Sequence, residues 1–200
     1  CGFTGEIIDR GDKQEILRRM TEIITHRGPD SSGFYTDGDV AMGFRRLSII
    51  DISETGDQPI YNEDKSLVLT FNGEIYNYRE LREILIEKGH VFSTQTDSEV
   101  LIHGFEEWRE GLLNKLRGMF GFAIWNRKDK SLFIARDYFG IKPVHYAVVN
   151  GNLVYGSEIK SILEYPGYEK KFNRNALDRY ISFEYSVPPE TFFEGVYALM

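Results

Sequence analysis

The sequence predicts an α+β fold in which antiparallel sheets are covered by helices. Two observations predict it: alternating apolar runs arrive mostly as hairpins, and helix patterns are inserted between groups of these runs. Hairpins pair antiparallel strands, whereas a parallel sheet needs a long crossover between consecutive strands. With 200 residues, of which 42% are hydrophobic, the chain can bury a sizeable core. A doubly wound parallel sheet is therefore not expected.

The predicted strands share alternating apolar residues and end at residues that favour turns. They cover residues 2–8, 33–50 with a turn at 37–39, 66–71, 119–126, 131–137, 144–149 and 152–157. The last two are separated by Asn150-Gly151, a dipeptide that is the strongest short-range signal for a hairpin.

The first predicted helix begins at Asp12, which forms a helix-start pattern with Glu15, and ends before Gly28-Pro29. One face of this helix carries apolar residues at helical spacing, which we expect to be buried. They are Ile16, Leu17, Met20, Ile23 and Ile24.

Four more helices are predicted. The second covers residues 78–88 and ends at Gly89. Its expected inward residues are Leu81, Ile84 and Leu85. Thr96 and Glu99 form a capping box before a third helix that runs to residue 108. The last two helices lie near residues 157–164 and 174–183.

Composition limits the possible functions. A net charge of −7 without a run of Lys and Arg argues against a nucleic-acid partner. No apolar stretch approaches the roughly 18 residues of a membrane span, so no membrane association is expected. A single cysteine makes no internal disulfide and builds no metal site alone, so we expect no metal and a cytoplasmic location. Residues 1–185 are expected to form one domain, and the proline-interrupted residues 186–200 the start of a linker.

The only cysteine is Cys1, which also carries the α-amine. A thiol needs a base, and none of the four histidines (His26, His90, His103 and His145) lies in a recognisable Cys-His motif. The α-amine, with an ordinary pKa of about 7.7–8.0, is the better candidate. The alternatives are a mere sequence boundary or the lipid-bearing cysteine of a lipoprotein. A lipoprotein needs a flexible tether, whereas an apolar strand follows Cys1 at once.

Asn72-Gly73 follows the predicted strand 66–71. The dipeptide is typical of a hairpin turn, but a helix rather than a return strand comes after it. An asparagine amide and a glycine N–H can instead form an oxyanion hole, in which one donor lowers the barrier by about 3 kcal/mol.

Seven segments occur in a characteristic order. They are Cys1-Gly2, residues 26–30 (HRGPD), 46–51 (RLSIID), 72–77 (NGEIYN), 96–99 (TDSE), Arg136-Asp137 with Gly140, and 157–160 (SEIK). Together they resemble the class II glutamine amidotransferase domain of the glutamine-hydrolysing asparagine synthetase family. The resemblance implies an N-terminal nucleophile hydrolase fold, a four-layer sandwich of two antiparallel sheets between layers of helices. It also implies that the initiator methionine is removed and that Cys1 attacks the side-chain amide of glutamine.

The resemblance assigns further residues to the glutamine site. Arg46 would hold the α-carboxylate, Asp97 with Glu74 the α-ammonium, and Ile49 would contribute a backbone group. Asn72 and Gly73 keep the oxyanion role, while Arg27 and Asp30 would shape the neighbouring loop. Arg46 in a surface ion pair and Asp97 in the first turn of a helix are the structural alternatives.

The implied reaction converts L-glutamine to glutamate and ammonia through a γ-glutamyl thioester, with no cofactor for this half. In the family, ammonia passes to a C-terminal synthetase domain that uses ATP and Mg²⁺ to convert aspartate to asparagine. The sequence contains neither a serine-glycine-glycine motif nor a phosphate loop, so residues 186–200 would lead toward that domain. The other possibilities are an amidotransferase with a sugar or other acceptor and a non-catalytic binding module of the same fold. A homodimer is compatible with the resemblance.

Overall fold

The structure is a computed structural model that describes residues 1–7, 11–47 and 57–200. Its strands are β1 (Gly2–Ile7), β2 (Ser31–Thr36), β3 (Val40–Arg46), β4 (Ile60–Tyr61), β5 (Leu67–Ile75), β6 (Gly118–Asn126), β7 (Ser131–Arg136), β8 (His145–Val149), β9 (Asn152–Gly156) and β10 (Val196–Ala198). The α-helices are α1 (Lys13–Glu22), α2 (Tyr78–Glu87), α3 (Ser98–Trp108), α4 (Ile159–Leu163) and α5 (Arg174–Phe183). In the described ranges, the 3₁₀ helices are η1 (Thr25–Arg27) and η3 (Arg109–Asn114).

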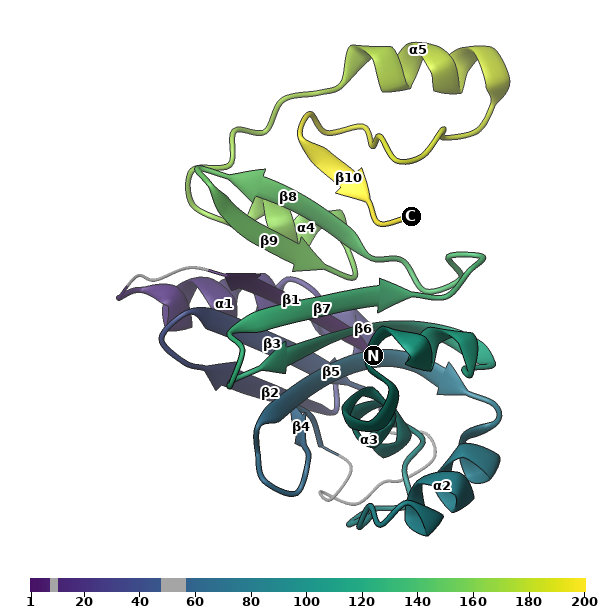
Figure 1. Cartoon of the computed structure of the whole chain (residues 1–200). Coiled ribbons are helices and arrows are strands. Elements are labelled where there is room, and N and C mark those ends of the chain that lie inside the picture. Colours follow the sequence, from purple (N-terminus) through teal and green to yellow (C-terminus); the bar gives the residue numbers. More distant parts are fainter. Residues whose placement is uncertain (8–10, 48–56) are drawn as a thin grey trace.

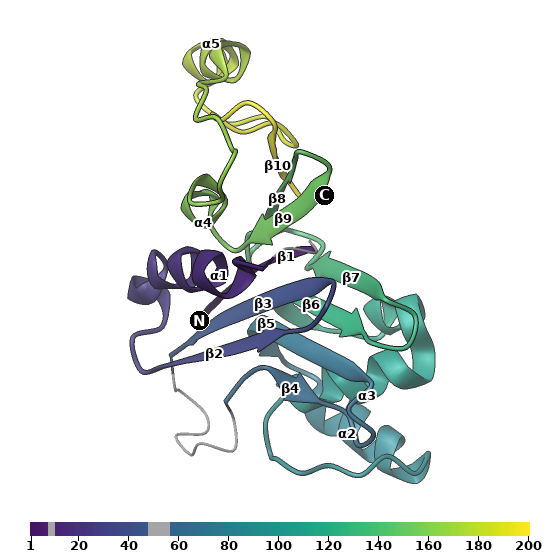
Figure 2. The same cartoon turned by 90° about the vertical axis from the view of Figure 1, so that its left-hand side faces the viewer.

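The strands form two sheets, and neighbouring strands are antiparallel throughout. The first sheet has the order β10-β8-β9-β1-β3-β2, and the second has the order β4-β5-β6-β7. Figures 1 and 2 show four layers: α1 and α4 outside the first sheet, the two sheets face to face, and α2 and α3 outside the second. The predicted α+β sandwich is therefore confirmed.

Three apolar clusters join these layers. The cluster between the sheets contains Phe3, Val40, Met42, Phe44, Val68, Ala123, Trp125, Val144 and Tyr155. A second cluster packs α2 and α3 on the second sheet, and a third packs α1 and α4 on the first. Each fully buried large apolar side chain contributes roughly 1.5–3 kcal/mol of transfer free energy, so the stacking of layers follows from the alternating strand pattern.

The first helix is shorter than predicted. It ends at Glu22, and Ile24 packs in the core while Ile23 at the C-cap is 41% exposed. The prediction that Ile23 is buried was wrong, because the helical spacing stops before this residue. A short 3₁₀ helix, η1, then leads toward Gly28.

Helices α2 and α3 follow the predicted ranges closely. On α2, Leu81 and Leu85 are buried as predicted. Ile84, also expected to point inward, is 37% exposed at the edge of the apolar stripe. The prediction that Thr96 and Glu99 form a capping box at the start of α3 was also wrong. The helix has Asp97 at its N-cap, and Glu99 accepts hydrogen bonds from the backbone and hydroxyl groups of Ser93 and Thr94 instead.

The hairpin predicted at Asn150-Gly151 joins β8 and β9. Both residues have positive φ, 52° for Asn150 and 84° for Gly151, as a tight two-residue turn between twisted strands requires. The strand-like region predicted over residues 33–50, with its turn at 37–39, forms β2 and β3, which pair with each other. Residues 48–50 of that range lie outside the described residues.

The C-terminal segment contributes to the first sheet. Within residues 186–200, interpreted as the start of a linker, β10 pairs with the edge strand β8. Helix α5 has no buried residues and lies apart from the four layers (Figure 1). The boundary of the domain at residue 185 stays a prediction. None of the helices in the described ranges combines the length and apolar composition that crossing a bilayer requires.

Candidate active site

Cys1 lies at the start of β1 and is held by its own backbone groups. Its α-amine donates a hydrogen bond to the carbonyl oxygen of Arg27 at 2.7 Å. The Nε of Arg27 donates in return to the carbonyl oxygen of Cys1 at 2.9 Å, while its Nη1 forms an ion pair with Glu158, also at 2.9 Å. Arg27 therefore fixes the position of Cys1, as expected of a residue that shapes the site.

The surroundings of the α-amine favour its neutral form. Burial lowers its pKa, and the positive charges of Arg27 and Lys142 lower it further, against the opposing charge of Asp30. The net result is a pKa of about 6 instead of the ordinary 8.0. Most of the amine is then unprotonated at neutral pH, which is what a general base requires.

The thiol of Cys1 faces the backbone of Leu47, directly after β3. The N–H of Leu47 donates to Sγ at 3.3 Å, and the carbonyl oxygen of Leu47 lies 3.5 Å from Sγ. An N–H donor stabilises negative charge that develops on sulfur. Leu47 could not be identified as a site residue from the sequence, because the contact uses backbone atoms and the side-chain type carries no signal.

Asn72 and Gly73 lie inside β5 rather than in a turn. They pair with Gly121 and Phe120 of β6, so the prediction that the strand ends at residue 71 was wrong. Gly73 allows the strands to approach closely, because an added Cβ would lie 2.1 Å from the carbonyl oxygen of Met119.

The side chain of Asn72 is suited to an oxyanion hole. It is 4% exposed, and its Nδ2 has no hydrogen-bond partner among the described residues. A buried amide donor without a partner costs about 1–3 kcal/mol, so it indicates a place for a ligand. Its pairing partner Gly121 lies beside Phe3 of β1, at 3.5 Å from an added Cβ, so this part of β6 contacts the strand that begins next to Cys1.

Arg46 is the last residue of β3 and its guanidinium is buried. Its Nη1 forms an ion pair with Asp57 at 2.7 Å, and the same carboxylate oxygen accepts a hydrogen bond from Ser31 at 2.9 Å. A buried cation next to Leu47 and Cys1 has the charge needed to hold a carboxylate. Asp57 was not identified from the sequence, because no motif surrounds it.

Asp97 and Glu74 form the acidic part of the site. Asp97 is buried at the N-cap of α3, and its Oδ2 accepts a hydrogen bond from the N–H of Ile75 at 2.8 Å. Burial raises the pKa of Asp97, and the charge of Glu74 raises it further. Two neighbouring carboxylates, of which Asp97 is buried, favour the binding of a cation between them. The structural alternative also holds in part, since Asp97 does begin the helix.

Asp137 organises the loop after β7. Its buried carboxylate accepts hydrogen bonds from the N–H groups of Phe120, Ile141 and Lys142 at 2.9–3.2 Å. This loop brings Lys142 near the α-amine of Cys1 and closes with Gly140 at φ +66°. The motif containing Asp137 was noted in the sequence, but the influence of Lys142 was not.

The predicted residues thus fall into two groups. Cys1 and Arg46 lie at one end of the first sheet, and Asn72, Gly73, Glu74 and Asp97 lie on β5 and at the start of α3. Ile49 lies outside the described residues. The thiol, the amine and the buried amide suit acyl transfer.

Comparison with known proteins agrees with this chemistry. A family model described as a glutamine amidotransferase domain matches residues 1–200. Glutamine-hydrolysing asparagine synthetase 1 of Bacillus subtilis is 44% identical over 196 residues, which cover 96% of this chain and 31% of that protein. Glutamine-hydrolysing asparagine synthetase 2 of Oryza sativa subsp. japonica is 42% identical over 151 residues, covering 75% of this chain and 25% of that protein. The chain thus spans a third or less of the length of these curated relatives.

Two solved structures share the fold. The glutamine phosphoribosylpyrophosphate amidotransferase from Bacillus subtilis, complexed with ADP and GMP, superposes with a TM-score of 0.71 at 21% identity, over 86% of this chain and 45% of that chain. The structure of an allosteric regulatory enzyme of purine biosynthesis gives 0.72 at 21% identity, over 82% and 43%. The N-terminal nucleophile hydrolase fold predicted from the motifs is confirmed. The chain belongs to the family of glutamine amidotransferase domains.

Proposed function

We propose that the chain hydrolyses L-glutamine to glutamate and ammonia, with Cys1 as nucleophile. The arrangement around Cys1 carries the proposal. One residue presents a thiol that receives an N–H from Leu47 and an amine that is held by Arg27. Nucleophile and base are therefore held together before substrate binds.

The reaction begins when Sγ of Cys1 attacks Cδ of glutamine and the thiol proton passes to the α-amine. A tetrahedral intermediate forms, and its oxyanion accepts hydrogen bonds from Nδ2 of Asn72 and the N–H of Gly73. The protonated amine then gives its proton to the leaving –NH₂ group, the C–N bond breaks, and ammonia leaves. Water attacks the resulting γ-glutamyl thioester, aided by the amine, and glutamate and the free thiol are formed. We expect no cofactor for this half, because the α-amine can carry each proton transfer.

The charged residues would orient glutamine. Arg46 binds the α-carboxylate, and Asp97 with Glu74 binds the α-ammonium, whose three donors match two carboxylates. Asp57 then shares Arg46 with the substrate or yields to it. A backbone group of Ile49 remains the predicted further contact.

The ammonia acceptor is proposed from the relatives. Because the curated relatives are named glutamine-hydrolysing asparagine synthetases and are about three times longer, we propose aspartate as acceptor and a C-terminal synthetase domain that uses ATP and Mg²⁺. A homodimer and a cytoplasmic location belong to the same proposal. A sugar or other acceptor remains the second possibility, since residues 1–200 contain no acceptor motif.

Labelling with an electrophilic glutamine analogue tests the proposal. Peptide mass spectrometry should find one adduct, on Cys1, that excess glutamine suppresses and that Cys1→Ala abolishes. The matched assay follows glutamate release by the unmodified chain and by Cys1→Ala. An unlabelled Cys1 and no glutamate release would favour the non-catalytic binding module instead.

A further inference from the structure

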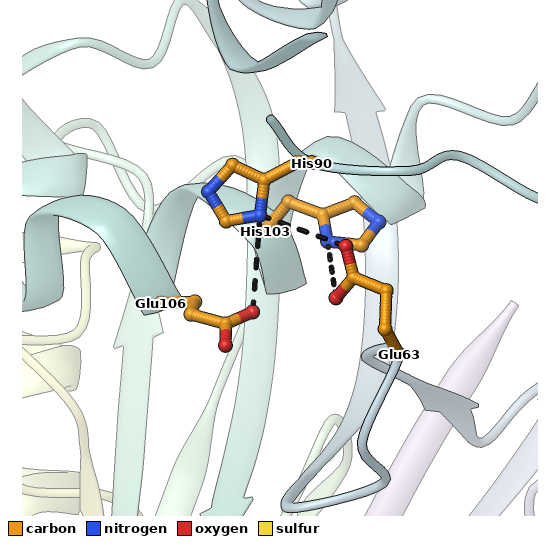
Figure 3. Close-up of side chains that lie close together, drawn as sticks. All are labelled: Glu63, His90, His103 and Glu106. Carbon is orange, nitrogen blue, oxygen red and sulfur yellow. Dashed lines mark ion pairs between the residues drawn. The ribbon is translucent and has the colours of Figure 1, made fainter. Parts of the chain in front are cut away.

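Four side chains outside the glutamine site converge at the edge of the second sheet (Figure 3). Glu63 lies in the loop between β4 and β5, His90 follows α2, and His103 and Glu106 lie one turn apart on α3. Each offers one potential ligand atom, and these atoms all lie within 4.8 Å of one another. The four positions form no motif in the sequence, so the cluster could not be predicted from it.

The side chain of His103 is the strongest sign of a ligand. It is 1% exposed, yet neither ring nitrogen has a hydrogen-bond partner in the part of the chain that the structure describes. Buried polar atoms without partners are rare, because they lose their bonds to water without replacement. The nearest carboxylates, of Glu63 and Glu99, lie 3.4 Å from Nδ1 and 3.5 Å from Nε2, longer than good hydrogen bonds, so a further ligand is expected at the ring.

The distances within the cluster fit a shared metal ion better than hydrogen bonds. Nδ1 of His103 lies 3.4 Å from Glu63, and Nδ1 of His90 lies 3.7 Å from Glu63 and 3.9 Å from Glu106. Hydrogen bonds between nitrogen and oxygen are mostly 2.7–3.2 Å long. Ligands of a tetrahedral ion with bonds of about 2.0–2.1 Å lie about 3.3 Å apart. The ligand atoms lie up to 4.8 Å apart, so the cluster has to contract around the ion, and the exposed side chains of Glu63 and Glu106 are free to move inward.

The outer contacts orient both imidazoles. Nε2 of His90 lies 3.6 Å from Glu107, and Nε2 of His103 lies 3.5 Å from the buried Glu99. Each histidine therefore turns Nδ1 toward the cluster and Nε2 toward a carboxylate outside it, as metal-ligating histidines commonly do.

Further contacts hold the ligands from behind. Glu63 accepts a hydrogen bond from the N–H of Val91, and Glu106 accepts one from Asn62. The backbone N–H of His90 bonds to Leu85 at the end of α2, next to Gly89 with its φ of +99°. The ligands are thus supplied by anchored segments, although they come from three different parts of the chain.

We propose that Glu63, His90, His103 and Glu106 bind one Zn²⁺-like divalent cation. Imidazole nitrogens with carboxylates suit Zn²⁺ and its neighbours in the first transition row, whereas Ca²⁺ and Mg²⁺ prefer all-oxygen sites. Glu63 and His103 also line a surface pocket of about 410 Å³, which gives the ion a path from solvent. The bound ion ties the β4–β5 loop and the end of α2 to α3, so its role is to stabilise the second sheet and its helices.

Calorimetric titration with Zn²⁺ tests the proposal on the Cys1→Ala chain, so that the thiol does not bind the metal. We expect about one site, and a rise in the melting temperature of roughly 5–10 °C when free Zn²⁺ is about 100-fold above its dissociation constant. Mg²⁺ at the same concentration should cause no such rise.

The specific test uses His90 and Glu106, because substitution of His103, which is 1% exposed, would disturb the core as well as the cluster. His90→Gln and Glu106→Gln should each weaken Zn²⁺ binding more than about tenfold. The matched control His26→Gln removes a histidine outside the cluster and should keep the affinity. No saturable Zn²⁺ binding, or binding that the two cluster variants leave unchanged, overturns the proposal. Neither outcome bears on glutamine labelling at Cys1, so the two proposals are tested separately.

Discussion

The pH dependence of glutamine hydrolysis tests the role of the Cys1 α-amine directly. The amine accepts a proton only in its neutral form, and its pKa is about 6. Roughly nine-tenths of it is therefore neutral at pH 7, against roughly one-tenth for an amine with a pKa of 8. We expect kcat/KM to be nearly flat above pH 7, half-maximal near pH 6, and about tenfold lower for each unit below.

Substitution of Lys142 should change the pKa of the Cys1 α-amine. Lys142 lowers the pKa of the amine through its positive charge. In Lys142→Gln that charge is gone, so the pKa rises and the acidic limb of the profile moves to higher pH. For a partly solvated charge we expect a shift of about half a unit. Lys142→Arg retains the charge and should leave the limb in place.

The assay measures glutamate release at subsaturating glutamine between pH 5 and 9. Protonation of Asp97 also weakens substrate binding at low pH, because its pKa is raised. The Asp97→Asn variant removes that contribution and should keep the limb near pH 6, at a lower overall rate. A limb near pH 8 in the unmodified chain, or an identical limb in Lys142→Gln, would refute the assignment of the amine as the base.

Three further predictions concern single side chains. Asn72→Ala should lower kcat for glutamine hydrolysis by about 10²–10³-fold with little change in KM, because the amide acts on the oxyanion; an effect on KM alone would contradict this role. Arg46→Lys should raise KM for glutamine roughly tenfold while kcat changes less, because lysine keeps the positive charge but loses the two-pronged hydrogen bonding of the guanidinium. An unchanged KM would argue against binding of the α-carboxylate by Arg46. Asp137→Asn should destabilise the fold by about 1–3 kcal/mol in urea unfolding at pH 7. Burial raises the pKa of Asp137, but its N–H donors lower it more, so the net pKa is below the ordinary value. The stabilisation by the carboxylate is therefore full above pH 4–5 and fades as the pH falls. An equal loss of unfolding free energy in Asp137→Asn at pH 7 and pH 3 would contradict this.

The elements with local signals could be predicted from the sequence. Alternating strands, the Asn150-Gly151 turn and the ranges of α2 and α5 depend on residues close together in the chain. The predictions were wrong where the extent of a strand or the burial of a side chain depends on a partner distant in the sequence. β5 continues through Asn72 because β6, some fifty residues later, supplies its ladder. Ile84 is half-exposed because the neighbouring layer covers only the Leu81–Leu85 stripe of α2.

The residues of the candidate site likewise divide into those that the sequence could predict and those that it could not. Cys1 and Asn72 were found because their side-chain chemistry is distinctive in sequence. Leu47 and Asp57 were missed: the first acts through backbone atoms, and the second is an ordinary surface aspartate until folding places it 2.7 Å from Arg46. The lowered pKa of the amine also depends on Lys142, more than 140 positions away in the chain. Such electrostatic effects arise only when the fold assembles.

The position of β1 between β9 and β3 determines how firmly Cys1 is held, and when this happens during folding. Chain ends usually fray, but here the residue after Cys1 begins a central strand with a hydrogen-bonded ladder on both sides. Opening β1 requires both ladders to break, so its amide protons should be among the slowest of the chain to exchange with deuterium. During synthesis the second ladder cannot form until residues near 156 have left the ribosome. The segment around Cys1 is thus among the last parts of the described fold to be locked in place.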